Sequence, residues 1–494
     1  MQGRVVQHHG EADQTGGDQG GGTHPELRQR PARWAGRNDH RRTIAGRAPG
    51  APRLRRTIIR AVAAILGPPM ARPSLGSVLR LATVDTRPLR RRDFSLLFAG
   101  QLVSRLGTMV TAVAVPFQLY QLTHSSLAVG LLGLVLLGPV LALAFLGGAL
   151  ADARDRRLMV LLTELVFMLC SALLLVNALL GQPLLWAIYA LAAVQGGLYA
   201  LQRPSLEAVL PRLVPDDEVT AAGSLTILRG TVGAVAGPAL AGILIAAAGL
   251  PIAYGVDVLT FAVSLVALAL MRATPPPPDA ERPSLRRVAE GLRYAWSRPD
   301  LRGTYAVDMV AMFFGMPEAL FPAVASGLGG PAALGLLFSA PAFGAMAAFA
   351  TSGWTGHVHR QGWGVIVAAT AWGLAIVGFG FAASLPLAIL CLAVGGAADA
   401  VSGIFRMAIW NRTIPDSLRG RLASIELLSY TTGPLLGNAE SGVVAGLGGV
   451  RISIVSGGVL CVAGCVVCAL LLPGFRAFDA RDWTSGGRGA ISKS

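Results

Sequence analysis

Residues 147–157 read GGALADARDRR and separate two long apolar stretches of the chain. Two glycines precede Leu150, and Asp152 is followed by a charged cluster that ends in Arg156 and Arg157. In a membrane protein, small residues allow two helices to approach closely, and arginines keep a short loop on the cytoplasmic side. A carboxylate at Asp152 can accept from helix N-terminal amides or pair with an arginine. The stretch therefore predicts a cytoplasmic hairpin between two membrane spans.

The composition indicates that most of the chain lies in a membrane. Of the 494 residues, 53% are hydrophobic and 14% are charged, whereas a soluble protein has about 25% charged residues. The net charge is +15, but the positive residues are spread over short loops and an N-terminal tail. Because they do not share one folded face, we predict no nucleic-acid partner. The fold class expected is an all-α polytopic membrane protein.

Twelve apolar stretches are each long enough for a membrane helix, which needs about 20 residues. They cover residues 95–121, 127–151, 158–180, 184–209, 220–247, 252–272, 303–326, 331–352, 363–383, 386–409, 421–446 and 450–472. The connections between them alternate in charge. One set is rich in arginine and includes Arg154, Arg212, Arg406 and Arg412, and the other set is almost free of positive residues. This asymmetry predicts a protein of the cytoplasmic membrane with both termini in the cytoplasm.

A run of four prolines at 275–278 divides the spans into two sets of six. Gly237-Pro238 in the first set and Gly433-Pro434 in the second occupy the same place. This repetition predicts two parallel six-helix halves around a central cavity. The predicted parts are a basic tail (1–69), a cytoplasmic N-terminal segment (70–94), a first half (95–272), a cytoplasmic linker (273–302) with one surface helix, a second half (303–472) and a cytoplasmic tail (473–494).

Two motifs resemble the major facilitator superfamily of transporters. The hairpin is similar to the superfamily loop G-x-L-A-D-R-x-G-R-R/K, with matches at Gly148, Leu150, Ala151, Asp152, Arg156 and Arg157. The fifth span is similar to the antiporter signature G-x-x-x-G-P-x-x-G-G, which is associated with export. Its matching residues are Gly233, Gly237, Pro238 and Gly242. The hairpin ending, the first outer loop and the linker are similar to the enterobactin exporter-like branch, which exports siderophores and drugs.

Ionisable residues inside predicted spans are functional candidates because they are costly in a bilayer. The resemblance implies that spans one, four, seven and ten line the cavity. A carboxylate there can gain and lose a proton as access alternates, and this role is assigned to Glu318, Asp399 and Asp308. An arginine stays charged and can hold an anionic or catechol-like group, which is the role expected of Arg105 and Arg229. The alternative is that these side chains pair and serve the structure, and Asp257 on span six is expected to be structural.

The resemblance also implies a conformational gate at the cytoplasmic ends of the first-half spans. Arg203 and Glu207 are spaced for an (i, i+4) pair, close to the predicted position of the hairpin. The gate residues expected are Gly148, Asp152, Arg156, Arg157, Arg203 and Glu207. Such residues would bias the conformational equilibrium rather than contact the substrate.

No catalytic motif, metal site or cofactor site is predicted. The chain has neither a zinc-binding H-E-x-x-H nor a phosphate-binding G-x-x-x-x-G-K-[ST] motif. Cys461, Cys465 and Cys468 share one helical face, but no acid or histidine accompanies them, so we interpret them as packing residues rather than a metal site. We expect a non-enzymatic monomer whose partners are the lipid bilayer, protons and a small organic substrate.

The function implied is alternating-access export, driven by proton antiport, with a siderophore as the leading substrate. A multidrug or macrolide efflux pump is the alternative within transporters. A membrane sensor or scaffold that moves no substrate is the alternative from another class.

Residues 1–69 contain no sustained apolar pattern and are rich in Gly, Arg, Gln and His, a composition that cannot form a packed core. We expect either a disordered tail or a start codon assigned too early, with Met70 as the true start. In the second case, mass spectrometry of the native protein will find no peptide upstream of Met70. Detection of such a peptide would rule out the later start.

Overall fold

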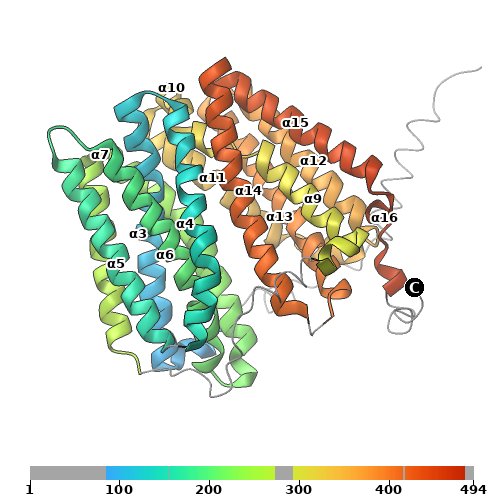
Figure 1. Ribbon diagram of the computed structural model, residues 1–494, viewed down its shortest axis with the longest axis horizontal. Coiled ribbons are helices and arrows are strands. Elements are labelled where there is room, and N and C mark those ends of the chain that lie inside the picture. The colour runs from blue at the N-terminus through green and yellow to red at the C-terminus, as the bar shows by residue number, and fades with distance from the viewer. Residues whose placement is uncertain (1–84, 154, 273–292, 416–417, 484–494) are drawn as a thin grey trace, which may run out of the picture. The chain divides into compact units, whose positions relative to one another are not determined.

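The computed structural model describes residues 85–153, 155–272, 293–415 and 418–483, and within these ranges the regular elements are helices (Figure 1). At 145–153 and at most positions from 419 to 428, only the backbone is described. Ten helical segments in these ranges are long and apolar enough to cross a membrane. One of them, Asp216–Ala269, contains both the fifth and the sixth predicted spans. A further long helix, α14 (Arg419–Gly448), occupies the eleventh. The chain is therefore a multi-pass, all-α membrane protein.

The first half consists of five long helices: α3 (Arg92–Thr123), α4 (Ser126–Ala153), α5 (Arg156–Leu179), α6 (Leu185–Val209) and α7 (Val219–Ala269). Short 3₁₀ turns η1 (Arg87–Arg90), η2 (Leu210–Arg212) and η3 (Asp216–Glu218) precede α3 and α7. The predicted loop between spans five and six is only a kink in α7, where Gly249 adopts a positive φ of 80°. Glycine accepts this conformation at little cost, so the chain reverses there without a longer loop.

The second half begins with a helix that breaks inside the predicted seventh span. Its first part, α9 (Pro299–Phe314), ends before Gly315, and the chain resumes as η4 (Glu318–Leu320) and α10 (Phe321–Leu328). Pro317 cannot donate a helical hydrogen bond. The remaining elements are α11 (Gly330–Ala350), η5 (Ser352–His357), α12 (Gln361–Gly380), α13 (Leu385–Thr413), α14, α15 (Val450–Leu471), α16 (Pro473–Arg476) and η7 (Ala480–Trp483).

Two sequence predictions need comment. Arg406 was counted among the basic loop residues, but it lies inside α13 and is only 2% exposed. The sequence signal was misleading because a buried arginine with partners and a loop arginine look alike in a charge count.

The predicted surface helix of the linker falls mostly outside the described residues, which resume at Arg293. There Tyr294 donates to the carbonyl oxygen of Thr413 at 3.0 Å and attaches the linker to the end of α13.

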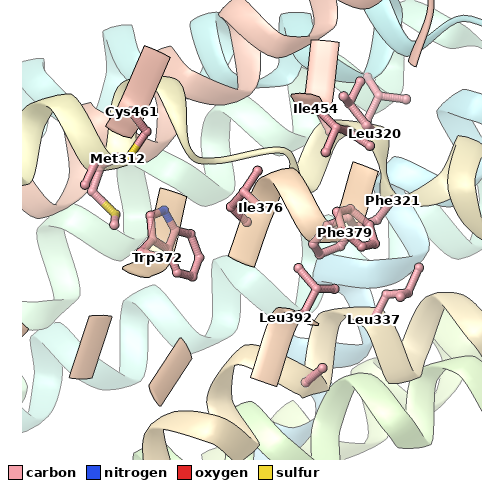
Figure 2. Packing of buried hydrophobic residues seen from close by; sticks show 14 of the residues in the cluster. Met312, Leu320, Phe321, Leu337, Trp372, Ile376, Phe379, Leu392, Ile454 and Cys461 are labelled. Carbon is pink, nitrogen blue, oxygen red and sulfur yellow. The ribbon is translucent and has the colours of Figure 1, made fainter. Parts of the chain in front are cut away.

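Aromatic and aliphatic side chains fill the second half, as Figure 2 shows for the region around Phe321 and Phe379. The two ring centroids are 5.6 Å apart at an interplanar angle of 80°, an edge-to-face arrangement that aromatic pairs favour. Cys461, Cys465 and Cys468 are buried and form no disulfide. Within the described residues no group of three or more His, Cys, Asp or Glu side chains could hold a metal.

The connections define two ends of the bundle. We call the basic end the one that carries residues 155–157, 210–218 and 358–360, and the opposite end the one that carries 124–125, 180–184 and 381–384. At the basic end, the backbone amide of Ala480 donates to the carbonyl oxygen of His359 at 2.8 Å. Nearby, Arg481 donates to Asp479 and holds the pKa of that carboxyl at about 2, so this pair stays ionised across the physiological range.

The two halves meet through glycines near the opposite end. A Cβ on Gly335 of α11 would collide with the Pro238 carbonyl oxygen and approach the Cα of Gly242 on α7 to 2.9 Å. The second contact joins Gly442 of α14 to Gly130 of α4, where a Cβ would lie 2.8 Å from the partner's Cα. Both contacts bring helix backbones together across the boundary between the halves (Figure 1). Small residues permit such close packing, and these contacts close the bundle at this end.

We predict that Gly442→Val destabilises the protein, whereas Gly446→Val one turn further along α14 does not. A side chain at Gly442 meets backbone, and overpacking of this kind costs about 1–3 kcal/mol. A Cβ on Gly446 has its nearest neighbour, Leu127 Cβ, at 3.6 Å. Thermal unfolding of both variants in the same detergent is the measurement. An equal shift in both melting temperatures would contradict this account of the contact.

Candidate functional site

A cavity of about 660 Å³ lies between the two halves. Most of its wall is apolar, and its polar lining residues are Arg105, Thr108, Thr111, Gln195, Tyr199, Asp257, Glu318 and Asn438. A smaller cavity of about 220 Å³ in the second half shares Glu318, Pro341 and Ala342 with it and also contacts Asp399. An apolar pocket with a few polar groups is the usual form of a small-molecule site.

Arg105 reaches the cavity because α7 provides space for its stem. A Cβ on Gly233 would lie 2.6 Å from Arg105 Cγ, and one turn later a Cβ on Gly237 would collide with Met109. The signature glycines of α7 thus have separate contacts, since Gly233 and Gly237 pack against α3 and Gly242 packs against α11. Pro238 lines the cavity itself. The motif therefore positions α7 against helices of both halves.

Arg229 lies one turn before Gly233 and is outside the cavity lining, which differs from the role expected for it. Both Arg105 and Arg229 are half-buried. Within the described residues, no carboxylate forms an ion pair with either guanidinium. The first half therefore holds two half-buried cationic side chains, of which Arg105 lines the cavity.

Glu318 stands at the break between α9 and α10, where it borders both cavities. The break is supported from α14, because Asn438 Oδ1 accepts from the backbone amide of Ala319 at 2.8 Å. Trp372 packs closely against Gly315 on the other side of the break. A helix interruption inside a membrane is tolerated where it lines a cavity or is buried in protein. Glu318 is therefore a half-buried carboxyl on an irregular segment beside the cavity.

Asp308 and Asp399 form a different kind of site, because Arg406 joins them. Its guanidinium pairs with Asp308 through Nη1 and lies 3.6 Å from Asp399 through Nη2. Ser429 donates to Asp308 at 3.1 Å, and the ring of Tyr430 lies 5.5 Å below the guanidinium carbon. These contacts unite α9, α13 and α14 around one buried arginine. A neighbouring cation favours the ionised carboxylate, so the arrangement opposes protonation of Asp308.

The residues predicted to form the gate lie at the basic end. Arg156 donates to the carbonyl oxygen of Ala208 at 3.1 Å, next to Glu207, and Arg157 donates to the carbonyl oxygens at the end of α7. The Arg203–Glu207 pair forms as expected at 2.9 Å, although its exposure limits its contribution to about 0.3–0.5 kcal/mol. At Gly148 and Asp152 only the backbone is described. In this structure the described gate contacts stay within the first half.

Asp257 lies in the cavity wall, although a peripheral position was expected for the sixth span. Its side chain is 1% exposed and accepts from Thr111 on α3 at 2.5 Å and from Ser171 on α5 at 2.6 Å. The continuous packing of α7 against α3 brings this part of the helix inward. The sequence pattern misses this because it gives no indication of which helices surround the sixth span.

The chain matches, over residues 83–486, the family described as transmembrane secretion effector. It is 30% identical over 397 residues to the enterobactin exporter EntS of Citrobacter koseri, covering 80% of this chain and 93% of that protein. It is also 30% identical over 380 residues to the enterobactin exporter EntS of Shigella boydii, covering 77% and 90%.

Solved transporter structures share the fold. A POT family transporter in complex with 5-aminolevulinic acid aligns with a TM-score of 0.63 and 13% identity, covering 78% of this chain and 97% of that one. The human organic anion transporter MFSD10 aligns with a TM-score of 0.55 and 15% identity, covering 76% and 99%. At these identities the similarity concerns the arrangement of helices.

We predict that Arg406→Met strongly destabilises the protein, because it leaves Asp308 buried without its cation. Breaking one partner of a buried pair costs about 3–5 kcal/mol. The double variant Arg406→Met/Asp308→Asn should recover a large part of this loss. Thermal unfolding in detergent measures both effects, with Arg412→Met, on the same helix, as the matched control. A double variant no more stable than Arg406→Met would show that the pair is not the cause.

Proposed function

Because the chain belongs to the transmembrane secretion effector family of the major facilitator superfamily and is a membrane exporter, we propose that it carries a siderophore out of the cell in exchange for protons. The family is one of transporters rather than enzymes. The proposed location is the cytoplasmic membrane, with the basic end and both termini in the cytoplasm. The observation that carries the proposal is the central cavity, in which Arg105 and Glu318 share a mostly apolar wall.

The cavity chemistry is suited to a molecule with aromatic rings and hydroxyl groups, such as a catecholate siderophore. Arg105 can hold an ionised or polarised phenolic oxygen, because a guanidinium offers several donors in a plane. Tyr199 and the apolar wall can contact aromatic rings. The enterobactin exporters, which resemble this chain along most of its length, support the same substrate class.

Glu318 is the preferred proton carrier in this proposal. An ionised Glu318 can accept a hydrogen bond from a substrate hydroxyl, whereas a protonated one has lost that charge. Substrate and proton then compete for one group, which is the requirement for antiport. Asp308 is less suited in this conformation, because it is paired with Arg406, and Asp399 lies 3.6 Å from the same guanidinium.

Alternating access would use the boundary between the halves. The glycine contacts close the end opposite to the basic end, so with the proposed orientation the cavity would face the cytoplasm and load from there. Rocking of the halves would then open those contacts and release the substrate outside. The gate residues Gly148, Asp152, Arg156, Arg157, Arg203 and Glu207 would form the closing contacts at the basic end in that second state.

The proposal is tested in bacteria that make enterobactin and lack their own exporter. Expression of residues 70–494 should restore enterobactin in the medium and lower it in the cytoplasm, both measured by mass spectrometry. Glu318→Gln should reduce the secretion rate by roughly tenfold, equivalent to about 1.4 kcal/mol. Glu440→Gln is the matched control, because Glu440 is another half-buried carboxyl of the second half that lines neither cavity.

Unchanged secretion with a normally expressed protein would reject the siderophore as substrate. The efflux alternative would then be tested with a panel of macrolides and other drugs. Raised drug resistance of the cells that express the protein would support it. A purified, folded protein that moves neither class, and shows no substrate-induced proton release, would favour a sensor or scaffold.

A further inference from the structure

The interior of the first half contains two polar layers that repeat at a spacing of seven residues on three helices. Ser104 and Thr111 on α3, Glu164 and Ser171 on α5, and Asp257 and Ser264 on α7 are the repeated pairs. Seven residues are about two helical turns, or about 10 Å along the axis. Each layer therefore contains one carboxyl, surrounded by hydroxyls or amides from neighbouring helices.

The layer nearer the cavity is built around Asp257. Both described donors, Thr111 and Ser171, reach the same oxygen, Oδ2. The other oxygen, Oδ1, is buried and has no hydrogen-bond partner among the described residues. It faces Gly107 of α3, where a Cβ would lie only 2.5 Å away. The glycine thus makes room for a carboxyl oxygen that has no hydrogen-bond partner in the described part of the chain.

The chemistry of this site favours a proton. A buried ionised carboxylate is costly without a cation or full hydrogen bonding, and no arginine forms an ion pair with Asp257 in the described part of the chain. Thr260 donates its hydroxyl hydrogen to the carbonyl oxygen of Asp257 at 2.7 Å. That hydroxyl oxygen and Oδ1 both border the position of a Cβ on Gly107. The Thr260 oxygen therefore keeps a lone pair beside Oδ1, where it can accept from a protonated carboxyl.

Among the described residues, the other ionisable groups around Asp257 do not supply a cation that would replace the proton. Glu164 from α5 and Tyr254 from α7 are the titratable groups nearest in the same interior. Tyr254 donates to Gln118 at 2.7 Å. Arg105, Tyr199 and Glu318 line the same cavity. Hydroxyls thus supply the direct contacts of the Asp257 carboxyl.

We propose that Asp257, held by Thr111 and Ser171 in the cavity wall, is a second proton-binding site that exchanges its proton with the cavity. This site deepens the proposed proton-coupled export, on which its role in transport rests. It places one proton carrier in each half, with Glu318 in the second half and Asp257 in the first.

The second layer provides the comparison. Glu164 accepts from Gln101 at 2.8 Å and from Gln202 at 3.1 Å, both at Oε1, while Oε2 is buried without a partner among the described residues. Its geometry is thus like that of Asp257, but Glu164 does not line the cavity. Glu164 is therefore a control for Asp257. It is a buried carboxyl with similar contacts, but it lacks the access to the cavity through which Asp257 would exchange a proton.

Infrared difference spectroscopy of the purified full chain in detergent tests the site without substrate. We expect a change of buffer from alkaline to acidic pH to produce a carbonyl stretch of a protonated carboxyl that is absent from Asp257→Asn. In Glu164→Gln this band should remain. After transfer to heavy water it should shift within the mixing time, because the cavity admits solvent. Ser171→Ala is a second variant, for the case that Asp257→Asn folds poorly. It keeps the Asp257 carboxyl but removes one hydrogen-bond donor to its carbonyl oxygen, so the band should move to higher frequency.

Three results would overturn the assignment. The first is a pH-induced spectrum that neither Asp257→Asn nor Ser171→Ala changes. The second is a band that exchanges no faster than the signal lost in Glu164→Gln. The third is a band that sodium chloride removes at constant pH, while choline chloride does not, because the carboxyl would then bind sodium.

The same samples, reconstituted in vesicles, keep the two proposals apart. With enterobactin as the probe, the wild type should release protons and Asp257→Asn should release at least tenfold fewer. If no variant responds to enterobactin, the proposed function fails while the infrared result still decides whether Asp257 binds a proton. If Asp257→Asn responds like the wild type, the site takes no part in coupling and the inference is wrong.

Discussion

In the described part of the chain, helix backbones come close together at glycines, where no side chain separates them. Lipid gives no hydrophobic force that would press two apolar helices together, so close packing must supply the attraction. Glycines at 242, 335, 130 and 442 make the contacts between the halves. Within the first half, Gly233 leaves room for the aliphatic part of the Arg105 side chain, and Gly107 borders the carboxyl of Asp257. The same residue type thus closes one end of the bundle and positions two polar groups of the cavity wall.

The two halves stabilise buried charge in different ways. In the second half Arg406 lies between two acids, and its removal leaves a charge that the membrane interior cannot solvate. In the first half Glu164 and Asp257 have amide and hydroxyl neighbours instead of a cation. An ionic cluster resists a change of protonation, while a carboxyl among neutral donors permits it. At Arg406 the ionic contacts link α9 and α13, whereas the carboxyl of Asp257 in the cavity wall has hydroxyl partners.

Much of the fold was accessible from the sequence. Hydropathy and the two motifs gave the membrane class and the superfamily, because both depend on local residue order. The positions of Arg105 and Glu318 beside the cavity were also expected, and the structure agrees. The chain reversal at Gly249 falls where a turn was predicted, but the break at Gly315 and the burial of Arg406 were not foreseen, since each depends on which helices pack together. The place of Asp257 in the cavity wall was not predicted for the same reason, because its hydroxyl partners come from helices distant in the chain.

The interruption after Phe314 divides one membrane crossing into two short levers. The lever on the basic side, α9, is bound to α13 and α14 through Asp308 and its partners. The lever on the other side, α10, is attached by Phe321, whose ring packs against Phe338 and Phe379. An apolar aromatic contact can slide, whereas an ion pair in lipid cannot be pulled apart cheaply. Under the proposed orientation α10 would be the outer of the two helices, and it could tilt to open the exit while the Asp308–Arg406 pair holds α9 in place.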